Sequence, residues 1–466
     1  MSAADALYAL LGPGKVLTDE AALRDRRHDR WALSELDDLA GRAAPSPACV
    51  VRAAELGDVV AVVNECRRTR TPLVPFGLGS GVCGGVLTSP GSVVLDLSGM
   101  RRVVEVDPTN LLATFEGGVR GSDAESTLEA HGLTLGHYPQ SIGVSSVGGW
   151  VATRAAGQFS TAYGNVEDVV LALQAVLPDG TVIETRRTPR ASSGPDLRHL
   201  LLGSEGTLGV VTEVTFSVRR VPEERMGAAY LVPTMAAGFD LQREIVQRGH
   251  LPAVLRQYDA IETGRMFSAW ARGDAALLLV VHEGPRERVE AERSGVARVA
   301  AASGATEIDS APTSHWLAER NHVPTFHSFL VNGIVLDTIE IAAPFSQILA
   351  IYERATSALG SVPGILAASA HSSHAYRSGV NLYFTFAAQP ASRDAMRDTY
   401  LECWDRVMEA TLAHGGGIAH HHGIGRVRRG WLERELGAGG LAALRAVKRA
   451  LDPTGFMNPG VLLPDG

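Results

Sequence analysis

The chain has 466 residues, of which 45% are hydrophobic and 20% charged, and it contains 50 glycines and 23 prolines. This composition is typical of a globular protein with about two to four domains, and it excludes the disordered, collagen-like and coiled-coil classes. The net charge of −8 disfavours a nucleic-acid partner, because proteins that bind nucleic acids usually carry a basic surface.

The basic residues and the cysteines narrow the chemistry further. Only two of the 43 basic residues are lysines, Lys15 and Lys448, and neither lies in a glycine-rich loop. A P-loop nucleotide hydrolase is therefore excluded, and Schiff-base chemistry is not expected. The four cysteines form neither a CxxC pair nor a zinc-ligand spacing, which favours reduced thiols in the cytoplasm.

Signals for export or membrane insertion are not predicted. The N-terminal stretch MSAADALYALLGPGKVL has no basic residues before its apolar part, and no apolar run reaches about 18 residues. We expect a cytoplasmic protein without an integral membrane segment. Peripheral attachment to a membrane and a homodimer both remain open.

The first half of the chain predicts short strands and helices separated by glycine-rich loops. A charged helical segment ends in a proline-rich stretch near residue 44, and strand, helix and strand follow it. The predicted elements are strands at 50–52, 73–76 and 92–96, helices at 56–66 and within 118–132, and a hairpin around Pro178-Asp179-Gly180. The glycine-rich segments lie at 77–85, 136–157 and 203–209.

After residue 222 the pattern changes to longer strands and helices. Strands are predicted for GAAYLVP, AALLLVVHEG, TIEIAAP and VNLYFTFAA. Helices are predicted for GFDLQREIVQR, PRERVEAERSGVARVAAA, FSQILAIYERATSALG and the C-terminal LAALRAVKRALDP. The fold class is therefore α+β, with a separate substrate-binding domain in the second half.

The first glycine-rich loop contains a formal GxGxxG motif at Gly79, Gly81 and Gly84. The dinucleotide-binding fingerprint requires a helix to start in this loop, whereas the following residues predict a strand. A loop between two strands can still cradle phosphate with its backbone N–H groups, or it can simply form tight turns. Three such loops favour close approach of the backbone to a bulky ligand.

These motifs, in their order along the chain, resemble one family of flavoproteins. PFGxGSG, PxSIGxxxVGGWVATRAAG, YGNVEDVV and GSEGTLGVVTEV are similar to the FAD-binding domain of the vanillyl-alcohol oxidase and p-cresol methylhydroxylase family. LYFTF, HHHGIG and LDPTGFMNPG resemble the C-terminal domain of FAD-linked oxidases. The motifs VGGWV, YGNxED and HHHGxG resemble most closely those of the alkylglycerone-phosphate synthase subgroup.

The resemblance implies a domain organisation and a cofactor. Residues 1–44 would form an N-terminal helical segment, 45–222 a two-subdomain FAD-binding domain of the p-cresol methylhydroxylase type, and 223–466 an α+β substrate (cap) domain with the FAD-linked oxidase C-terminal segment. FAD would be bound without a covalent link. The implied cofactor-binding residues are Pro75, Phe76, Gly77, Leu78, Gly79, Ser80, Gly81, Val82, Gln140, Ser141, Ile142, Gly143, Ser145, Ser146, Gly149, Arg154, Ala155, Gly157, Tyr163, Gly164, Glu205, Gly206, Thr207, Gly209, Val210 and Val211.

Cys83 stands near the place where some members of the family attach FAD through a histidine. A thioether link to FAD and a small buried residue are the two interpretations of this cysteine.

The run His420-His421-His422 is the most conspicuous cluster of polar residues in the second half. Three adjacent histidines cannot easily bind one metal ion, because neighbouring side chains point in different directions, and no metal ligands are predicted. The run is either exposed to solvent, a surface site that binds a metal ion only adventitiously, or a polar wall over the flavin that supplies a base near neutral pH.

Tyr383 and Arg256 are the other catalytic candidates. In a strand, Tyr383 and Thr385 would share one face of the sheet. The resemblance implies that Tyr383 donates or accepts a proton, whereas the alternative is a core tyrosine. Arg256 matches a family arginine needed for activity and could neutralise a carboxylate or phosphate, or stabilise the reduced flavin. Its alternative is a structural ion pair with Asp259.

The chain departs from the synthase pattern at one position. Alignment on the segment 339–345 places Phe326 where the synthases carry an arginine, with Arg320 six residues earlier. We expect both residues to contact substrate. A phosphorylated ketone becomes a doubtful substrate, and a smaller, more apolar one fits Phe326 better.

Comparison with the metal-assisted 2-hydroxy-acid dehydrogenases narrows the class further. Their HxGDGNxH and EHGxG motifs correspond here to HSSHAYRSGVNLY and to a segment in which His421 replaces the Glu. The acidic metal ligands are missing, so this class is disfavoured, and His371 and His374 have no assigned role.

Three functions compete. The first is an FAD-dependent oxidase or dehydrogenase that oxidises a small hydroxyl- or amine-bearing substrate by hydride transfer to flavin N5, with an unknown electron acceptor. The second is a transferase like alkylglycerone-phosphate synthase, which exchanges an acyl for an alkyl group through a flavin adduct. The third is a flavin-fold protein without catalysis. Phe326 favours the first function.

Overall fold

The chain packs into two units, which the computed structural model describes over residues 2–323 and 325–464. The first unit comprises the chain up to Ala156, Asn165–Arg220 and the chain from His421 onward. The second unit comprises Gly157–Gly164 and Val221–His420. Among the described residues, no helix has both the length and the apolar character that crossing a membrane requires.

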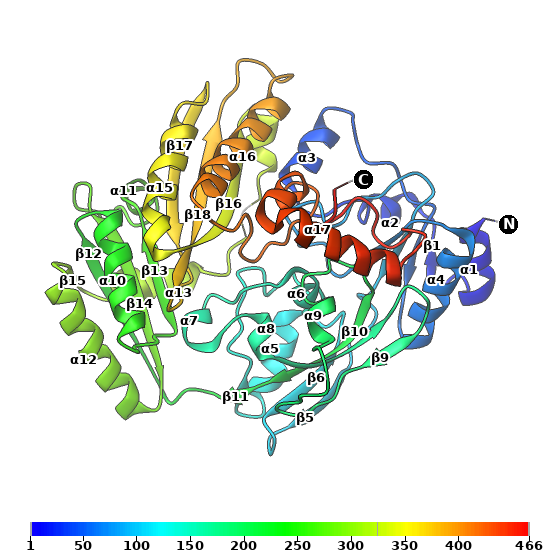
Figure 1. Cartoon of the computed structure of the whole chain (residues 1–466), viewed down its shortest axis with the longest axis horizontal. Coiled ribbons are helices and arrows are strands. Elements are labelled where there is room, and N and C mark those ends of the chain that lie inside the picture. Colours follow the sequence, from blue (N-terminus) through cyan, green and yellow to red (C-terminus); the bar gives the residue numbers. More distant parts are fainter. Residues whose placement is uncertain (1, 324, 465–466) are drawn as a thin grey trace. The chain divides into compact units, whose positions relative to one another are not determined.

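The first unit is built on three sheets (Figure 1). Its strands are β1 (Val16–Leu17), β2 (Cys49–Arg52), β3 (Leu73–Phe76), β4 (Val93–Asp96), β5 (Val103–Asp107), β6 (Leu112–Glu116), β7 (Leu133–Thr134), β8 (Val170–Val176), β9 (Val182–Glu184), β10 (Val210–Ser217) and β11 (Arg219–Arg220). Its helices are α1 (Ala3–Leu11), α2 (Glu20–Arg24), α3 (Ala32–Leu39), α4 (Leu56–Thr69), α5 (Gly121–Glu129), α6 (Val147–Thr153), α8 (Val166–Val169), α9 (Arg198–Leu201), the 3₁₀ helix η1 (Arg429–Trp431) and α17 (Leu432–Leu451).

The four-stranded sheet of this unit has the order β1-β2-β4-β3, with β2, β4 and β3 parallel. Helix α4 connects β2 to β3, and a reciprocal pair of hydrogen bonds between Glu55 and Asp58 caps its N-terminus. No helix follows the glycine-rich loop after β3; β4 follows it instead. The prediction that this loop does not belong to a dinucleotide-binding fingerprint is therefore confirmed.

The five-stranded sheet has the antiparallel order β5-β6-β10-β8-β9 and carries the larger core of this unit. The large side chains buried in that core include Phe115, Trp150 and Phe216. The ring centroid of Phe216 lies about 6 Å from that of Phe115 and about 6 Å from that of Trp150. Helices α5 and α6 supply Leu128 and Trp150 to it. The second glycine-rich segment contains α6 and contributes Ile142 and Val147 to the same core.

The second unit is built on one seven-stranded sheet, which is antiparallel throughout and has the order β15-β12-β14-β13-β17-β18-β16. Its strands are β12 (Glu224–Val232), β13 (Val254–Tyr258), β14 (Ala276–Gly284), β15 (Thr306–Ile308), β16 (Val335–Pro344), β17 (Ile365–Ser372) and β18 (Gly379–Ala388). Its helices are α7 (Ser160–Tyr163), α10 (Met235–Gln247), α11 (Ala260–Met266), α12 (Arg286–Ala302), α13 (Ala311–Glu319), α14 (His327–Val331), α15 (Phe345–Gly360) and α16 (Met396–Ala413).

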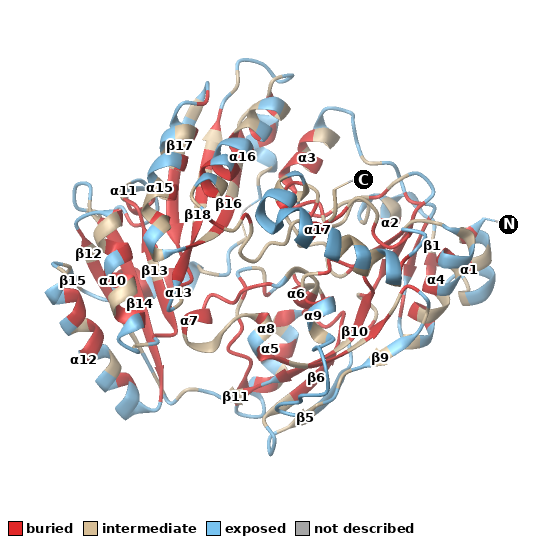
Figure 2. Cartoon of the chain, in the orientation of Figure 1, coloured by how far each residue is buried: buried red, intermediate tan, exposed pale blue. Residues whose placement is uncertain are grey.

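The two faces of this sheet differ in chemistry. On one face Gln257 of β13 bonds to Gln242 of α10, and Phe386 of β18 packs on Tyr400 of α16, so this face meets the long helices. Strand β14 is buried along its whole length (Figure 2). Because side chains alternate along a strand, the neighbours of Gln257 and Phe386 face the other way. That opposite face carries the polar residues described below. The α+β class predicted from the sequence is confirmed.

Candidate functional site

The loop after β3 has the geometry of an anion cradle. Gly79 has φ +66°, and a Cβ atom there would lie 2.7 Å from the ring of Phe76. A Cβ at Gly84, which has φ +72°, would lie 2.5 Å from Trp31, and one at Gly81 would lie 2.9 Å from Asp29. The glycines therefore allow the backbone to adopt a path that residues with side chains could not follow.

The backbone N–H groups at the start of this loop have no acceptor within the described part of the chain. In the part of the chain that the structure describes, no hydrogen bond leaves the N–H groups of residues 77–82, and all six residues are half-exposed. Successive N–H groups without partners are the donors that a phosphate oxygen needs. The loop therefore fits a pyrophosphate group, and most of the implied cofactor-binding residues lie in the same unit.

The second glycine-rich segment supports the first. Ser146 caps α6 by accepting from the N–H of Gly149, and a Cβ at Gly77 would lie 2.5 Å from the Ser146 hydroxyl. Ser145 accepts a hydrogen bond from Trp150 at 2.8 Å and donates to the carbonyl of Ser141 at 2.9 Å. These bonds fix the turn 141–146 on α6 and bring it against the first loop.

Glu205 in the third glycine-rich segment holds the C-terminal part of this unit. It has φ +50°, and its buried carboxylate accepts the N–H groups of Ile424 and Gly425 at 2.8 Å. Burial raises the pKa of Glu205 to about 7, although the two backbone donors act in the opposite direction. The side chain thus contacts the HHHGIG segment. Its expected contact with the cofactor remains a prediction.

Cys83 is buried, and Arg428 Nη1 donates to its Sγ at 2.8 Å. Arg428 also donates to the carbonyl of Gly423. A Cβ at Gly425 would lie 2.1 Å from the carbonyl oxygen of Cys83. The cysteine thus packs between the first glycine-rich loop and the C-terminal segment, and both interpretations of it stay open.

Three implied cofactor-binding residues lie in the other unit. Gly157, Tyr163 and Gly164 belong to the segment 157–164, whose side chains are bound by the seven-stranded sheet and its helices. Tyr163 donates to Glu283 at 2.6 Å, and Gln158 Nε2 donates to the carbonyl of Arg320 at 2.9 Å. Their contact with FAD remains a prediction.

Arg256, His371 and Tyr383 come together on the polar face of the seven-stranded sheet, from β13, β17 and β18. Arg256 Nη2 lies 2.8 Å from Nε2 of His371, and the rings of His371 and Tyr383 are stacked with centroids 4.8 Å apart. Arg256 also donates through Nε to the Tyr258 hydroxyl, and its guanidinium lies over the rings of Tyr258 and Trp316. The catalytic candidates Arg256 and Tyr383 are thus joined through a histidine.

Arg256 makes no ion pair with an acidic residue anywhere in the described ranges 2–323 and 325–464. Asp259, the partner that the sequence suggested as an alternative, instead caps α11 and accepts the N–H of Ala370 at 2.6 Å. Burial raises the pKa of Asp259 to about 6. The guanidinium is half-buried and keeps donors for an anion.

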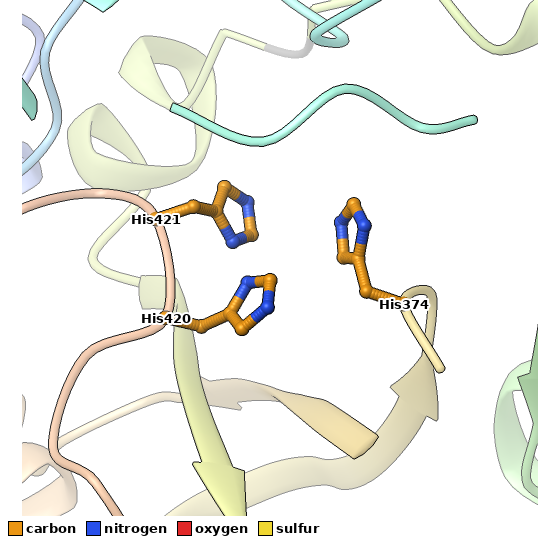
Figure 3. Close-up of side chains that lie close together, drawn as sticks. All are labelled: His374, His420 and His421. Carbon is orange, nitrogen blue, oxygen red and sulfur yellow. The ribbon is translucent and has the colours of Figure 1, made fainter. Parts of the chain in front are cut away.

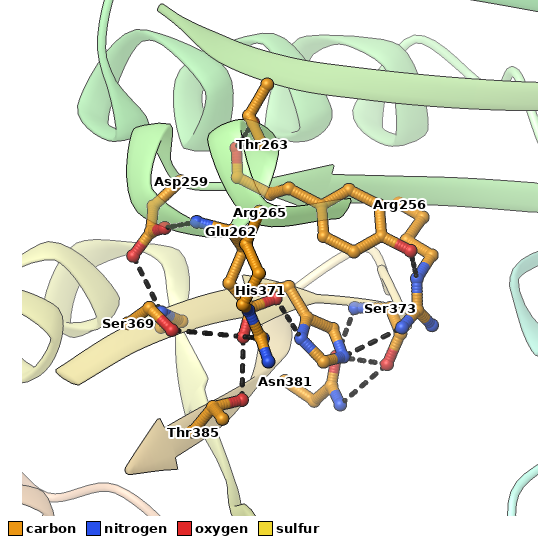
Figure 4. A network of polar contacts seen from close by, with 12 residues as sticks. Arg256, Asp259, Glu262, Thr263, Arg265, Ser369, His371, Ser373, Asn381 and Thr385 are labelled. Atoms are coloured by element: carbon orange, nitrogen blue, oxygen red, sulfur yellow. Dashed lines mark hydrogen bonds and ion pairs between the residues drawn. The ribbon is translucent and has the colours of Figure 1, made fainter. Parts of the chain in front are cut away.

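Glu262, which the sequence did not single out, contacts Nδ1 of His371, whereas Arg256 contacts Nε2 of the same ring (Figure 4). Its fully buried carboxylate accepts from His371 Nδ1 at 2.8 Å, Thr385 at 2.6 Å and Ser369 at 3.2 Å, and it pairs with Arg265. Burial alone would raise the pKa of Glu262, but His371 and the other donors lower it to about 2. The carboxylate is therefore ionised.

A second histidine cluster lies beside this one. The rings of His374 and His420 are stacked with centroids 4.9 Å apart (Figure 3), Ser160 lies 2.6 Å from Nδ1 of His374, and Tyr376 lies 2.7 Å from Nε2 of His420. The backbone N–H of His420 donates to Glu340, whose cross-strand neighbour is Tyr383. Burial lowers the pKa of His420, so its ring is neutral near pH 7.

The three histidines of the run are divided between the two units. His420 packs with the second unit, whereas His421 and His422 belong to the first, where their rings meet edge to face with centroids 4.6 Å apart. All three are half-exposed. Their expected role as a base remains a prediction.

The two residues expected to bind substrate follow α13 in the chain: Arg320 ends this helix, and Phe326 precedes α14. Arg320 donates to Gln158 at 2.8 Å, and its guanidinium lies 5.0 Å from the Phe159 ring centroid. Phe326 caps the short helix α14 and is half-buried. The role of both residues at a substrate stays a prediction.

Family models match both halves of the chain. One described as "FAD binding domain" matches residues 47–186, and one described as "FAD linked oxidases, C-terminal domain" matches residues 221–462. These matches agree with the glycine-rich segments and with the polar sheet face, and they identify FAD as the cofactor.

Individual proteins are similar over nearly the whole chain. An "Uncharacterized FAD-linked oxidoreductase YgcU" from Escherichia coli strain K12 is 34% identical over 99% of this chain and 98% of its own. The structure of an alkyldihydroxyacetonephosphate synthase is 26% identical, with a TM-score of 0.82 over 98% of this chain and 85% of its own. The structure of a p-cresol methylhydroxylase shares the fold, with a TM-score of 0.78, 18% identity and coverage of 98% and 95%.

Proposed function

Because the chain belongs to the FAD-linked oxidases, with FAD as its cofactor, we propose that it oxidises a small substrate that carries a hydroxyl or amine group and an anionic group. The observation that supports this most is the half-buried guanidinium of Arg256, which has no acidic partner among the described residues. This guanidinium contacts His371, and the His371 ring stacks on Tyr383. An anion bound at Arg256 would lie near a phenol that can exchange a proton.

FAD, when bound, supplies the two-electron acceptor for such an oxidation. The chain contributes the rest. The N–H groups of residues 77–82 bind the pyrophosphate of the cofactor, which leaves binding of the substrate to other residues. Arg256 binds the anionic group with its free donors, in the fork geometry that a carboxylate matches.

Tyr383 holds or takes the proton of the substrate hydroxyl or amine through its phenol oxygen. Its ring is fixed by stacking on His371, so that the oxygen has one position rather than several. His420, whose backbone is tied to Glu340 opposite Tyr383, is the second candidate for moving this proton. Its ring is neutral near pH 7 and can accept.

The second candidate function is a transferase that exchanges an acyl for an alkyl group. The similarity in structure to an alkyldihydroxyacetonephosphate synthase favours it, since Tyr383 and the histidine run follow the pattern of that subgroup. Phe326 disfavours the transferase, because the synthases carry an arginine at the aligned position.

The test is the visible spectrum of the purified holoprotein, recorded under anaerobic conditions with a panel of alcohols, hydroxy acids and amines. We expect the flavin absorbance to bleach with a member that carries a carboxylate and to stay unchanged with the matched uncharged compound. A spectrum that no member of the panel changes, with turnover of acylated dihydroxyacetone phosphate, would replace the oxidase proposal by the transferase. Bleaching by uncharged compounds alone would overturn the role of Arg256.

A further inference from the structure

Glu262 is the only acidic residue of the described chain that bonds to His371, and it does so from the short helix α11. It is fully buried and its carboxylate has four partners: His371, Ser369, Thr385 and Arg265. Two of them, Ser369 and Thr385, come from neighbouring strands of the sheet. A carboxylate bound from several elements is fixed in position and can fix a neighbour in turn.

His371 faces partners that dictate one protonation state. A guanidinium can only donate hydrogen bonds, so Nε2, which faces Arg256 at 2.8 Å, must be bare. An ionised carboxylate can only accept, so Nδ1, which faces Glu262 at 2.8 Å, must carry the proton. Both partners select the same neutral tautomer, and the doubly protonated ring would place an N–H group against the guanidinium.

Electrostatics agree with this assignment. Burial lowers the pKa of His371 first of all, and Arg256 lowers it too, whereas Glu262 acts in the opposite direction; the net direction is downward. The neutral imidazole thus separates the positive charge of Arg256 from the negative charge of Glu262. A carboxylate that orients a histidine from behind is a familiar arrangement in catalytic and metal sites.

His371 is also the centre of a row of rings. It is the cross-strand neighbour of Tyr258 on β13 and of Tyr383 on β18. Its ring lies 4.8 Å from that of Tyr383 with an interplanar angle of 12°, and 5.3 Å from that of Tyr258 with an angle of 32°. A rotation of the His371 ring would therefore move the support of Arg256 and of Tyr383 at once.

We propose that Glu262 is a positioning residue, whose carboxylate fixes His371 in the Nδ1–H tautomer so that His371 holds both the Arg256 guanidinium and the Tyr383 ring. This inference rests on the proposed function for its consequence in turnover, but the tautomer itself can be measured without any substrate. Neither Glu262 nor His371 needs to touch the substrate for this role.

The chain offers a matched control in the same unit. His282 Nδ1 lies 2.8 Å from Glu292, which is the distance between His371 Nδ1 and Glu262, and both histidines are buried. Among the described residues, no group bonds to Nε2 of His282. The control pair therefore has the carboxylate and the histidine but lacks the arginine on the other nitrogen.

The experiment is a long-range proton–nitrogen NMR spectrum of the holoprotein labelled with 15N-histidine, with the His371 signals assigned by their loss in a His371→Asn variant. We expect wild-type His371 to show a protonated Nδ1 and a bare Nε2 between pH 6 and 8. We expect the Glu262→Ala variant to lose this pattern and Glu292→Ala to keep it. A protonated Nε2 in the wild type, or an unchanged pattern in Glu262→Ala, overturns the proposal.

The wild-type spectrum decides the matter even where Glu262→Ala does not fold. With any substrate that the flavin spectrum identifies, Glu262→Ala should lower kcat/KM by about 10- to 100-fold, in the range found for groups that orient a reacting residue, and Glu292→Ala should leave it unchanged. Equal losses in both variants would show that only general stability is affected and would overturn the proposal. If no compound of the panel is a substrate, that result contradicts the proposed function but not the proposed role of Glu262.

Discussion

The rings of His371 and Tyr383 lie almost parallel on neighbouring strands, with centroids 4.8 Å apart and an interplanar angle of 12°. Their partners on either side are Arg256, which bonds to His371, and Glu340, which is the cross-strand neighbour of Tyr383. Three strands therefore bring a cation, an imidazole and a phenol into one row. Arg256 and Tyr383 lie at the two ends of that row, and each can be tested by substitution.

Replacement of Tyr383 by Phe should abolish turnover while FAD stays bound. The substitution removes one oxygen and keeps the ring that stacks on His371, so the fold should be unchanged. Loss of a group that transfers a proton lowers rates by about 100-fold or more. The measurement is turnover together with the flavin absorbance per protein. Tyr230→Phe is the control, because the buried Tyr230 hydroxyl has no partner. Full activity of Tyr383→Phe would remove this tyrosine from the mechanism.

Replacement of Arg256 by Lys should weaken the binding of anionic substrates. A lysine keeps the charge but cannot reach both the Tyr258 hydroxyl and His371 with the planar fork of the guanidinium. We expect KM for a carboxylate-bearing substrate to rise by about 10-fold or more, and KM for an uncharged analogue to change little. Arg243→Lys, on the outer helix α10, is the control. An equal change of KM for both substrates would contradict an anion site at Arg256.

The sequence predicted the local structure of the first glycine-rich loop and of β18 because these features depend on near neighbours. The strand after the first loop excluded a dinucleotide fingerprint, and the alternation in LYFTF placed Tyr383 and Thr385 on the half-exposed face, with Phe384 and Phe386 buried. Both follow from backbone geometry and from the two-residue period of a strand.

The partners of Tyr383 could not be predicted in the same way. Arg256, His371 and Tyr383 lie on β13, β17 and β18, which are neighbours in the sheet but are far apart in the sequence. Strand pairing over such separations is set by the register of the whole sheet, which no local pattern specifies. The sequence left His371 without a role for this reason, and Glu262 looked like an ordinary helix residue.

The segment 157–164 shows the same limit. Its motif GQFSTAYG continues the second glycine-rich segment without a break, and the resemblance implied that Gly157, Tyr163 and Gly164 contact the cofactor, which stays a prediction. Its side chains bind Glu283, Arg320 and His374, because long-range hydrogen bonds attach it to the second unit. A division of the chain into consecutive domains cannot indicate that a short segment packs with the second unit while the residues on both sides of it belong to the first.

Replacement of Gly79 by Ala should weaken FAD binding, whereas Gly91→Ala should not. Both glycines have positive φ angles, +66° and +74°, so either alanine costs about 1 kcal/mol of stability through backbone strain. A Cβ at Gly79 would also lie 2.7 Å from the Phe76 ring and displace the N–H groups of the cradle. A Cβ at Gly91 would meet no described atom within 4 Å, apart from those of its chain neighbours.

We therefore expect the Kd for FAD to rise by about 10-fold or more in Gly79→Ala and to stay near the wild-type value in Gly91→Ala, because a loop that misses even one or two N–H contacts loses about 1 to 3 kcal/mol. Titration of FAD into the apoprotein, followed by flavin fluorescence, measures both. Equal affinities in the two variants would show that the cradle lies elsewhere.

The last prediction concerns the pH dependence of stability at Glu205. Burial raises its pKa to about 7, so the folded state keeps a proton that the unfolded chain releases near pH 4.5. A carboxyl group with a raised pKa in the folded state contributes stability at low pH, and this contribution disappears as the pH rises through 7. Because one unit of pKa corresponds to 1.36 kcal/mol, Glu205 alone makes the free energy of unfolding fall by up to about 3 kcal/mol between pH 5 and 8.

Urea unfolding at pH 5, 6, 7 and 8 measures this decline. The Glu205→Gln variant cannot titrate and should show a flatter curve, even if it is less stable at every pH because its amide accepts from Ile424 and Gly425 with one oxygen only. A residual decline is expected from Asp29, whose pKa burial raises to about 6. Glu129→Gln, at the exposed end of α5, should follow the wild-type curve. A decline of equal size in Glu205→Gln would mean that Glu205 is ionised throughout, held by the backbone N–H groups of the HHHGIG segment rather than by a proton.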